Sequence, residues 1–168
     1  LTNIATPFIR NIATIGGNIC AKDHKHTLFA PLMALDARLE FRNQNETRTE
    51  NIRNFKGVPE GFILSNIRIP LLDAELSIFR RIGAERNITP QSASFAFLAD
   101  TEKYSLLKVH LAFAGPFTFH SQELENSLIG KRLPLTQKDI IQIENQVDEE
   151  FSKAATDKMM SVVTRQQF

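Results

Sequence analysis

The sequence contains one cysteine, one tyrosine and no tryptophan among its 168 residues. The single thiol, Cys20, excludes an internal disulfide and any iron–sulfur or structural zinc site built from cysteines of this chain alone. Thirteen phenylalanines against one tyrosine favour core packing over stacking platforms for nucleic-acid bases. A lone thiol is typical of the cytoplasm, where we expect the protein to reside.

Long apolar runs and an excess of one charge are also missing. No stretch reaches the roughly 20 apolar residues that a membrane-spanning helix needs, and the first residues lack the basic and apolar regions of a signal peptide. Lysine and arginine number 20 and aspartate and glutamate 19, with the signs interspersed, so the basic stripe of a nucleic-acid binder is absent. The chain begins at Leu1 rather than Met, which leaves room for an upstream portion.

Strand patterns precede helical patterns along the chain. A short opening helix is expected at 6–13, with Thr6 as its cap and the glycine pair as its end, and a buried helix is expected from about Pro31. Strands are predicted at 38–42, 47–52, 62–69, 76–82, 92–99 and 105–113, with a turn at 100–103, and helices follow at 124–129 and from 136. This order predicts the α+β class rather than alternating βαβ units, with a boundary near residues 70–73.

The adjacent residues Gly16 and Gly17 form the most informative local motif. Without side chains over the backbone, N–H groups can approach an anion closely. The neighbouring Thr14 offers a hydroxyl, and Asn18 offers an amide able to hydrogen-bond a phosphate or ribityl oxygen. On residue chemistry alone a glycine pair is more often a plain turn, so both interpretations stay open at this point.

The run TIGGN at 14–18 resembles a loop of the FAD-binding domain in xanthine dehydrogenases, carbon monoxide dehydrogenase medium subunits and related molybdenum hydroxylases. The similarity continues in order through IATPFIRN at 4–11, LMALDA at 32–37, LSNIRIP at 64–70, FRRIG at 79–83, SASFA at 92–96 and a leucine-rich helix ending at Gly130. It implies the second subdomain of a PCMH-type FAD-binding domain at 1–73. Residues 74–168 would form a small carboxy-terminal domain of antiparallel strands and a helical bundle.

The resemblance implies a cofactor site with no catalytic residue and no metal. The TIGGN residues would contact the FAD diphosphate and ribityl chain, two apolar residues would pack near the flavin ring, and an arginine replaces a lysine that relatives often place there. A threonine stands where many relatives have an aspartate that accepts hydrogen bonds from the cofactor. The TIGGN residues are Thr14, Ile15, Gly16, Gly17 and Asn18. The two apolar residues are Ile4 and Leu64, the arginine is Arg81, and the threonine is Thr27.

The resemblance implies an electron-transfer subunit that passes electrons from iron–sulfur clusters to NAD or another acceptor. Its partners would be a molybdenum cofactor subunit and an iron–sulfur subunit, with a homo-oligomer left open. The family's first glycine-rich phosphate loop has no counterpart here, so we expect the isolated chain to hold FAD poorly and to be inactive. The alternative is a non-catalytic scaffold that docks partner subunits after losing its flavin. The substrate would bind on the molybdenum subunit. By analogy it could be a purine, nicotinate, an aromatic acyl compound or carbon monoxide, and a purine is slightly favoured.

Three other candidate positions have simpler explanations. Asp23, His24 and His26 could hold a metal, but three polar residues without a fourth ligand at a recognisable spacing are usually a solvated loop. Cys20 has no histidine and aspartate arranged to activate it, which favours a small buried apolar residue over a nucleophile. His110 falls inside a strand and is expected to be half-buried there.

Overall fold

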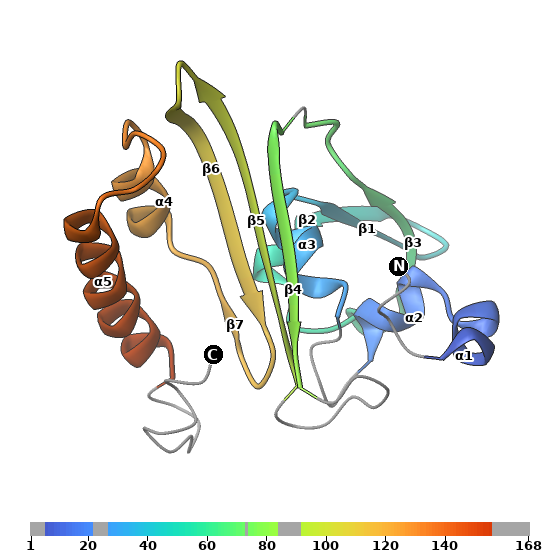
Figure 1. The fold of residues 1–168 in the computed structure, drawn as a ribbon. Coiled ribbons are helices and arrows are strands. Elements are labelled where there is room, and N and C mark those ends of the chain that lie inside the picture. The colour runs from blue at the N-terminus through green and yellow to red at the C-terminus, as the bar shows by residue number, and fades with distance from the viewer. Residues whose placement is uncertain (1–5, 22–26, 73, 84–91, 156–168) are drawn as a thin grey trace.

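The computed structural model describes residues 6–21, 27–72, 74–83 and 92–155, which form two antiparallel sheets and five α-helices (Figure 1). The second sheet stands in the middle of the fold. Helices α4 and α5 cover one of its faces, and α3 together with the first sheet covers the other. The predicted α+β class, with antiparallel sheets and helices, is confirmed.

The first sheet lies in the amino-terminal part of the chain and has the strand order β2-β1-β3. The predicted hairpin is confirmed, because β1 and β2 pair antiparallel with Arg38 opposite Asn51. Three short helices precede the sheet, and a single 3-10 turn follows β2. The elements are α1 (Pro7–Ile12), α2 (Ile15–Cys20), α3 (Phe29–Ala34), β1 (Arg38–Arg42), β2 (Thr47–Asn51), η1 (Ile52–Asn54) and β3 (Ile63–Arg68).

The second sheet has the order β4-β5-β6-β7, and each strand pairs antiparallel with its sequence neighbour. Two helices follow it, as the change of period in the sequence predicts. The elements are β4 (Leu76–Ile82), β5 (Ala93–Glu102), β6 (Ser105–Ala114), β7 (Thr118–Phe119), α4 (Gln122–Leu128) and α5 (Gln137–Ala155).

Side-chain size alternates along β5 and β6, and this alternation builds two cores. Successive residues of a strand point to opposite faces. On one face Ala96, Ala112 and Ala114 are at most 3% exposed and join the core around α3. On the other face larger residues, including Leu111 and Phe113, form a second core with α4 and α5. The small alanines allow α3 to lie close to the sheet. The core around α3 therefore contains residues from before and after residue 73. The predicted division into two domains at that residue stays a prediction.

The glycine pair does not end the first helix. Helix α1 ends at Ile12, and Thr14 then caps a second helix, α2, whose first turn contains Gly16 and Gly17. The expected break therefore comes earlier than predicted. The physical reason is that a threonine side chain satisfies an N–H of the first turn and so starts a new helix.

The predicted turn at 100–103 is also displaced. Strand β5 continues through Glu102, and the hairpin reverses at Lys103 and Tyr104, whose φ angles are 50° and 67°. Two consecutive positive φ angles are characteristic of the two-residue turns that match the twist of antiparallel strands. Glycine and asparagine usually mark such turns, so the pair Lys103-Tyr104 gave no signal in the sequence.

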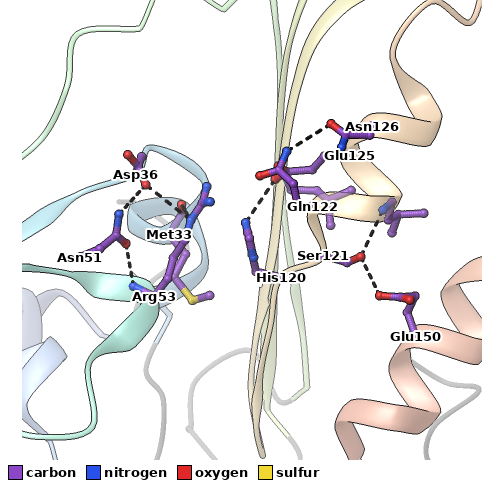
Figure 2. A network of polar contacts seen from close by, with 12 residues as sticks. Met33, Asp36, Asn51, Arg53, His120, Ser121, Gln122, Glu125, Asn126 and Glu150 are labelled. Atoms are coloured by element: carbon purple, nitrogen blue, oxygen red, sulfur yellow. Dashed lines mark hydrogen bonds and ion pairs between the residues drawn. The ribbon is translucent and has the colours of Figure 1, made fainter.

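Polar side chains face each other where the lobe of the first sheet (α1 to β3) meets the lobe of the second sheet (β4 to α5) (Figure 2). On the side of the first sheet, the Asp36 carboxylate accepts from Asn51 Nδ2 at 2.6 Å and lies 3.6 Å from Arg53 Nε. On the side of the second sheet, His120 Nε2 lies 3.9 Å from Glu125 Oε1. The pKa of His120 is lowered, first by burial and then by the positive charge of Arg53. His120 is therefore held in its neutral form more strongly than in an unfolded chain.

Glu125 is a carboxylate with 1% of its surface exposed, and it completes the edge of β6. Strand β7 pairs only with Phe113 and Ala114, so the next N–H along that edge needs another acceptor. Glu125 Oε1 accepts the Leu111 N–H at 2.9 Å. A buried N–H without a partner would destabilise the fold, which explains why the buried face of α4 contains this acid.

Candidate functional site

The segment Thr14–Asn18 forms the amino-terminal turn of α2. Thr14 Oγ1 accepts the Gly17 N–H at 3.0 Å, and the Thr14 carbonyl accepts the Asn18 N–H at 3.0 Å. The motif is thus a capped helical turn rather than an open loop. Its direction in space is fixed by the threonine, whose extended backbone at φ −114° and ψ 157° leads into the helix.

Two amide groups of this turn remain available to an anion. The first N–H groups of a helix have no partner inside it. The Gly17 N–H is occupied by Thr14, but within the described part of the chain the N–H groups of Ile15 and Gly16 have no hydrogen-bond partner. The prediction that both glycine amides contact phosphate stays a prediction, and the Gly17 N–H already has a partner inside the turn.

The two glycines differ in what a side chain would meet. A Cβ at position 17 would lie 3.1 Å from Thr14 Oγ1, so a side chain there would require the Thr14 cap to shift by a few tenths of an ångström. A Cβ at position 16 would lie 3.8 Å from Leu64 Cδ2, which is an ordinary contact distance. Packing inside the chain does not require glycine at position 16. A bare backbone beside two unpaired N–H groups therefore fits an external group that approaches closely, as a diphosphate would.

Asn18 connects α2 to the start of α3, which follows Thr27 in the chain. Asn18 Oδ1 accepts the Leu28 N–H at 3.3 Å, which leaves the amide nitrogen of Asn18 as its donor side. Thr27 precedes Leu28 directly and is buried, with 6% of its surface exposed. Both predicted residues therefore lie close to the TIGGN turn, and the role of Asn18 within the fold is to fix the chain that follows.

Apolar side chains surround the turn. Leu64 of β3 is half-buried and packs on the core around α3, next to Gly16. Ile15 is 46% exposed, and Phe8 and Ile12 of α1 are 75% and 70% exposed. None of the residues of α1 is buried. Leu64 thus provides an apolar side chain next to Gly16, and Ile15 and α1 expose further apolar side chains.

The remaining predicted positions lie elsewhere. Arg81 is half-buried on β4, opposite Ser94 of β5, and so belongs to the second sheet, whereas α2 and Leu64 belong to the first lobe. Ile4 lies outside the described residues, as do Asp23, His24 and His26, so the structure does not place them.

No strong nucleophile or metal site emerges from the described residues. Cys20 is half-buried, and burial raises the pKa of its thiol, which disfavours the reactive thiolate. His110 lies half-buried in β6, as predicted. Within 6–21, 27–72, 74–83 and 92–155, no group of three histidine, cysteine, aspartate or glutamate side chains could hold a metal ion. Over the same residues, no helix combines the length and apolarity needed to cross a membrane.

Comparison with known proteins assigns a family to this turn and the lobe around it. Residues 1–72 match the family described as the FAD binding domain in molybdopterin dehydrogenase. This match and the relative described next support the resemblance to FAD-binding subunits of molybdenum hydroxylases. The glyceraldehyde dehydrogenase medium chain of Sulfolobus acidocaldarius is 26% identical over 133 residues, which are 74% of this chain and 47% of that protein. The resemblance inferred from the ordered motifs is confirmed.

Solved structures extend the likeness of fold to the second lobe. Carbon monoxide dehydrogenase from Hydrogenophaga pseudoflava has a TM-score of 0.75 at 20% identity, over 88% of this chain and 54% of that chain. Quinoline 2-oxidoreductase from Pseudomonas putida has a TM-score of 0.71 at 13% identity, over 98% of this chain and 59% of that chain. The chain thus spans about half the length of the relatives it matches, and at these identities the likeness concerns the fold.

Proposed function

We propose that this chain is part of the FAD-binding electron-transfer subunit of a molybdenum hydroxylase, and that it receives the FAD diphosphate on α2. One observation carries the proposal: in a lobe that matches an FAD-binding domain, Gly16 presents an N–H that no described residue accepts and a bare backbone that internal packing does not require. Bound FAD would supply the redox chemistry, and the chain would supply binding, orientation and electrostatic tuning.

We propose the following roles for the implied residues. The N–H groups of Ile15 and Gly16 would donate to diphosphate oxygens, and Thr14 would hold the turn in shape through Gly17. Leu64 and the Ile15 side chain would offer apolar contact to the cofactor. The proposal keeps Ile4 as a second apolar contact, Asn18 and Thr27 as hydrogen-bonding residues, and Arg81 as the positive charge near the flavin ring.

The complete enzyme would contain further subunits. We propose a molybdenum cofactor subunit and an iron–sulfur subunit as partners, with NAD or another acceptor receiving the electrons. The relatives reported above are named for glyceraldehyde, carbon monoxide and quinoline, so the purine substrate that was slightly favoured draws no support from them. An oxidoreductase for an aldehyde or another small carbon compound is the better-supported proposal.

The test uses the complete natural subunit and a Gly16→Ala variant. We expect the natural subunit to show flavin absorbance bands and the variant to bind FAD about tenfold more weakly, because a methyl group at the turn keeps the diphosphate from its closest approach. Without FAD the variant should be as stable as the natural protein or up to about 1 kcal/mol more stable, since alanine is the better helix residue. A colourless natural subunit that ignores added FAD contradicts the proposal.

The scaffold alternative is motivated by two features of the same turn. Thr27 supplies no negative charge to the cofactor, and the Gly17 N–H is already bonded to Thr14. Under this alternative the complete subunit still co-purifies with its partner subunits but neither contains nor takes up FAD. Equal FAD affinity of the Gly16→Ala variant and the natural subunit would instead place the cofactor away from α2.

A further inference from the structure

A small pocket lies between the connection from β3 to β4 and one face of the second sheet. Its volume is about 260 Å³, smaller than the pockets of drug-sized ligands. The connection contributes Leu72 and Ala74, and the sheet contributes Leu98 and Asp100 from β5 and Lys108 and His110 from β6. The pocket is formed by other residues than the candidate flavin turn.

The strand register brings the polar residues of this pocket together. Leu98 lies opposite His110, and Asp100 lies opposite Lys108. Residues two apart on a strand share a face, so all four side chains lie on the face toward the connection. The sheet thereby places one carboxylate, one ammonium group and one imidazole around a single cavity with apolar walls.

In the part of the chain that the structure describes, no ion pair or side-chain hydrogen bond joins the carboxylate, the ammonium group and the imidazole to one another. Among the described residues, no ion pair joins Asp100 to Lys108, although they are direct cross-strand partners. The His110 Nδ1 atom is buried and has no hydrogen-bond partner. A buried polar atom without a partner is costly and uncommon in folded proteins. His110 and Lys108 both line the pocket, so the cavity offers an imidazole ring and an ammonium group to one ligand.

We propose that this pocket binds a small organic monocarboxylate. The carboxylate would accept hydrogen bonds from Lys108 Nζ and from the His110 ring, and the apolar part would lie against Leu72 and Leu98. Asp100 repels a second negative charge, so a dicarboxylate or a phosphate dianion fits less well than a monoanion. The ammonium group of Lys108 likewise disfavours a metal cation. Because the pocket includes the connection between the two sheets, the ligand would tie the two lobes together.

The experiment follows the histidine ring signals of the complete natural subunit by NMR while benzoate or benzamide is added. Benzamide has nearly the same shape as benzoate but no charge. We expect a saturable shift of the His110 signal, identified by its loss in a His110→Asn variant, with benzoate binding about tenfold more tightly than benzamide.

The matched variants are Lys108→Gln and Lys138→Gln. Both remove one exposed lysine charge, but Lys138 lies on α5, outside the pocket. Lys108→Gln should weaken benzoate binding about tenfold, and Lys138→Gln should leave it unchanged. The proposal is overturned if benzoate leaves the His110 signal unmoved, if benzamide binds equally well, if both lysine variants behave alike, or if inorganic phosphate binds more tightly than benzoate.

Discussion

Replacing Glu125 with alanine should destabilise the fold far more than removal of a surface acid. The Glu125 side chain is 1% exposed and accepts the Leu111 N–H at 2.9 Å. Leaving that N–H buried and unpaired costs about 1–3 kcal/mol. The lost methylene group adds about 0.8 kcal/mol. Relief from burying a charge offsets part of this, so the free energy of unfolding should fall by about 2–3 kcal/mol.

The assay is thermal or urea unfolding of the complete subunit, with two companion variants. For a protein larger than this chain, each kcal/mol shifts Tm by about 2 °C, so Glu125→Ala should lower Tm by roughly 5 °C. Glu125→Gln retains an oxygen that accepts the Leu111 N–H and should cost about 1 kcal/mol or less. Glu123→Ala changes an exposed acid on the same helix and should lie within about 0.5 kcal/mol of the natural protein.

Two results would refute this reasoning. If Glu125→Ala and Glu123→Ala have the same small effect, the β6 edge does not depend on the buried carboxylate. If Glu125→Gln is as damaging as Glu125→Ala, the negative charge near His120, rather than an acceptor for Leu111, is what the fold requires.

Three further predictions concern other elements. Gly17→Ala should weaken the hydrogen-exchange protection of α2, because the added Cβ would lie 3.1 Å from Thr14 Oγ1. In a Thr14→Ala background the same substitution should have a smaller effect. Equal effects in both backgrounds would rule out that contact. The lowered pKa of His120 means that stability falls as pH drops below about 6.5, since the unfolded chain binds the proton more readily, so urea titrations should show a smaller loss toward pH 5.5 for His120→Gln. The pKa of Asp139 is lowered to about 2, first by the Lys131 hydrogen bond, so its stabilisation is present above 3.8 and is lost as pH falls through about 2. Lys131→Gln should raise this pKa in a carboxyl NMR titration, and an unchanged value would contradict the assignment.

The candidate site could be located from the sequence but not described from it. The TIGGN run at 14–18 and the ordered motifs around it predicted the family correctly, because glycine and cap residues stand at fixed positions in the chain. The distinction between Gly16 and Gly17 could not be predicted. It depends on where Thr14 Oγ1 and Leu64 Cδ2 lie, and Leu64 is far from the glycines in sequence.

The polar residues between the lobes gave no signal at all. Asp36, Arg53, His120 and Glu125 are separated by up to 89 positions along the chain, and each alone looks like an ordinary surface residue. Folding of α3 onto the second sheet brings the first two close to His120. The same holds for Asp100, Lys108 and His110, whose meeting depends on the register of β5 and β6.

By itself, the sequence determined what depends on short-range order: the strands of alternating polarity, the threonine caps, the α+β class and the glycine-containing turn. Tertiary structure decided which groups are buried, which amides are already bonded and which charges meet. Those properties depend on distances between residues remote in sequence, which are set by strand register and by the packing of the second sheet against α3 and against α4 and α5.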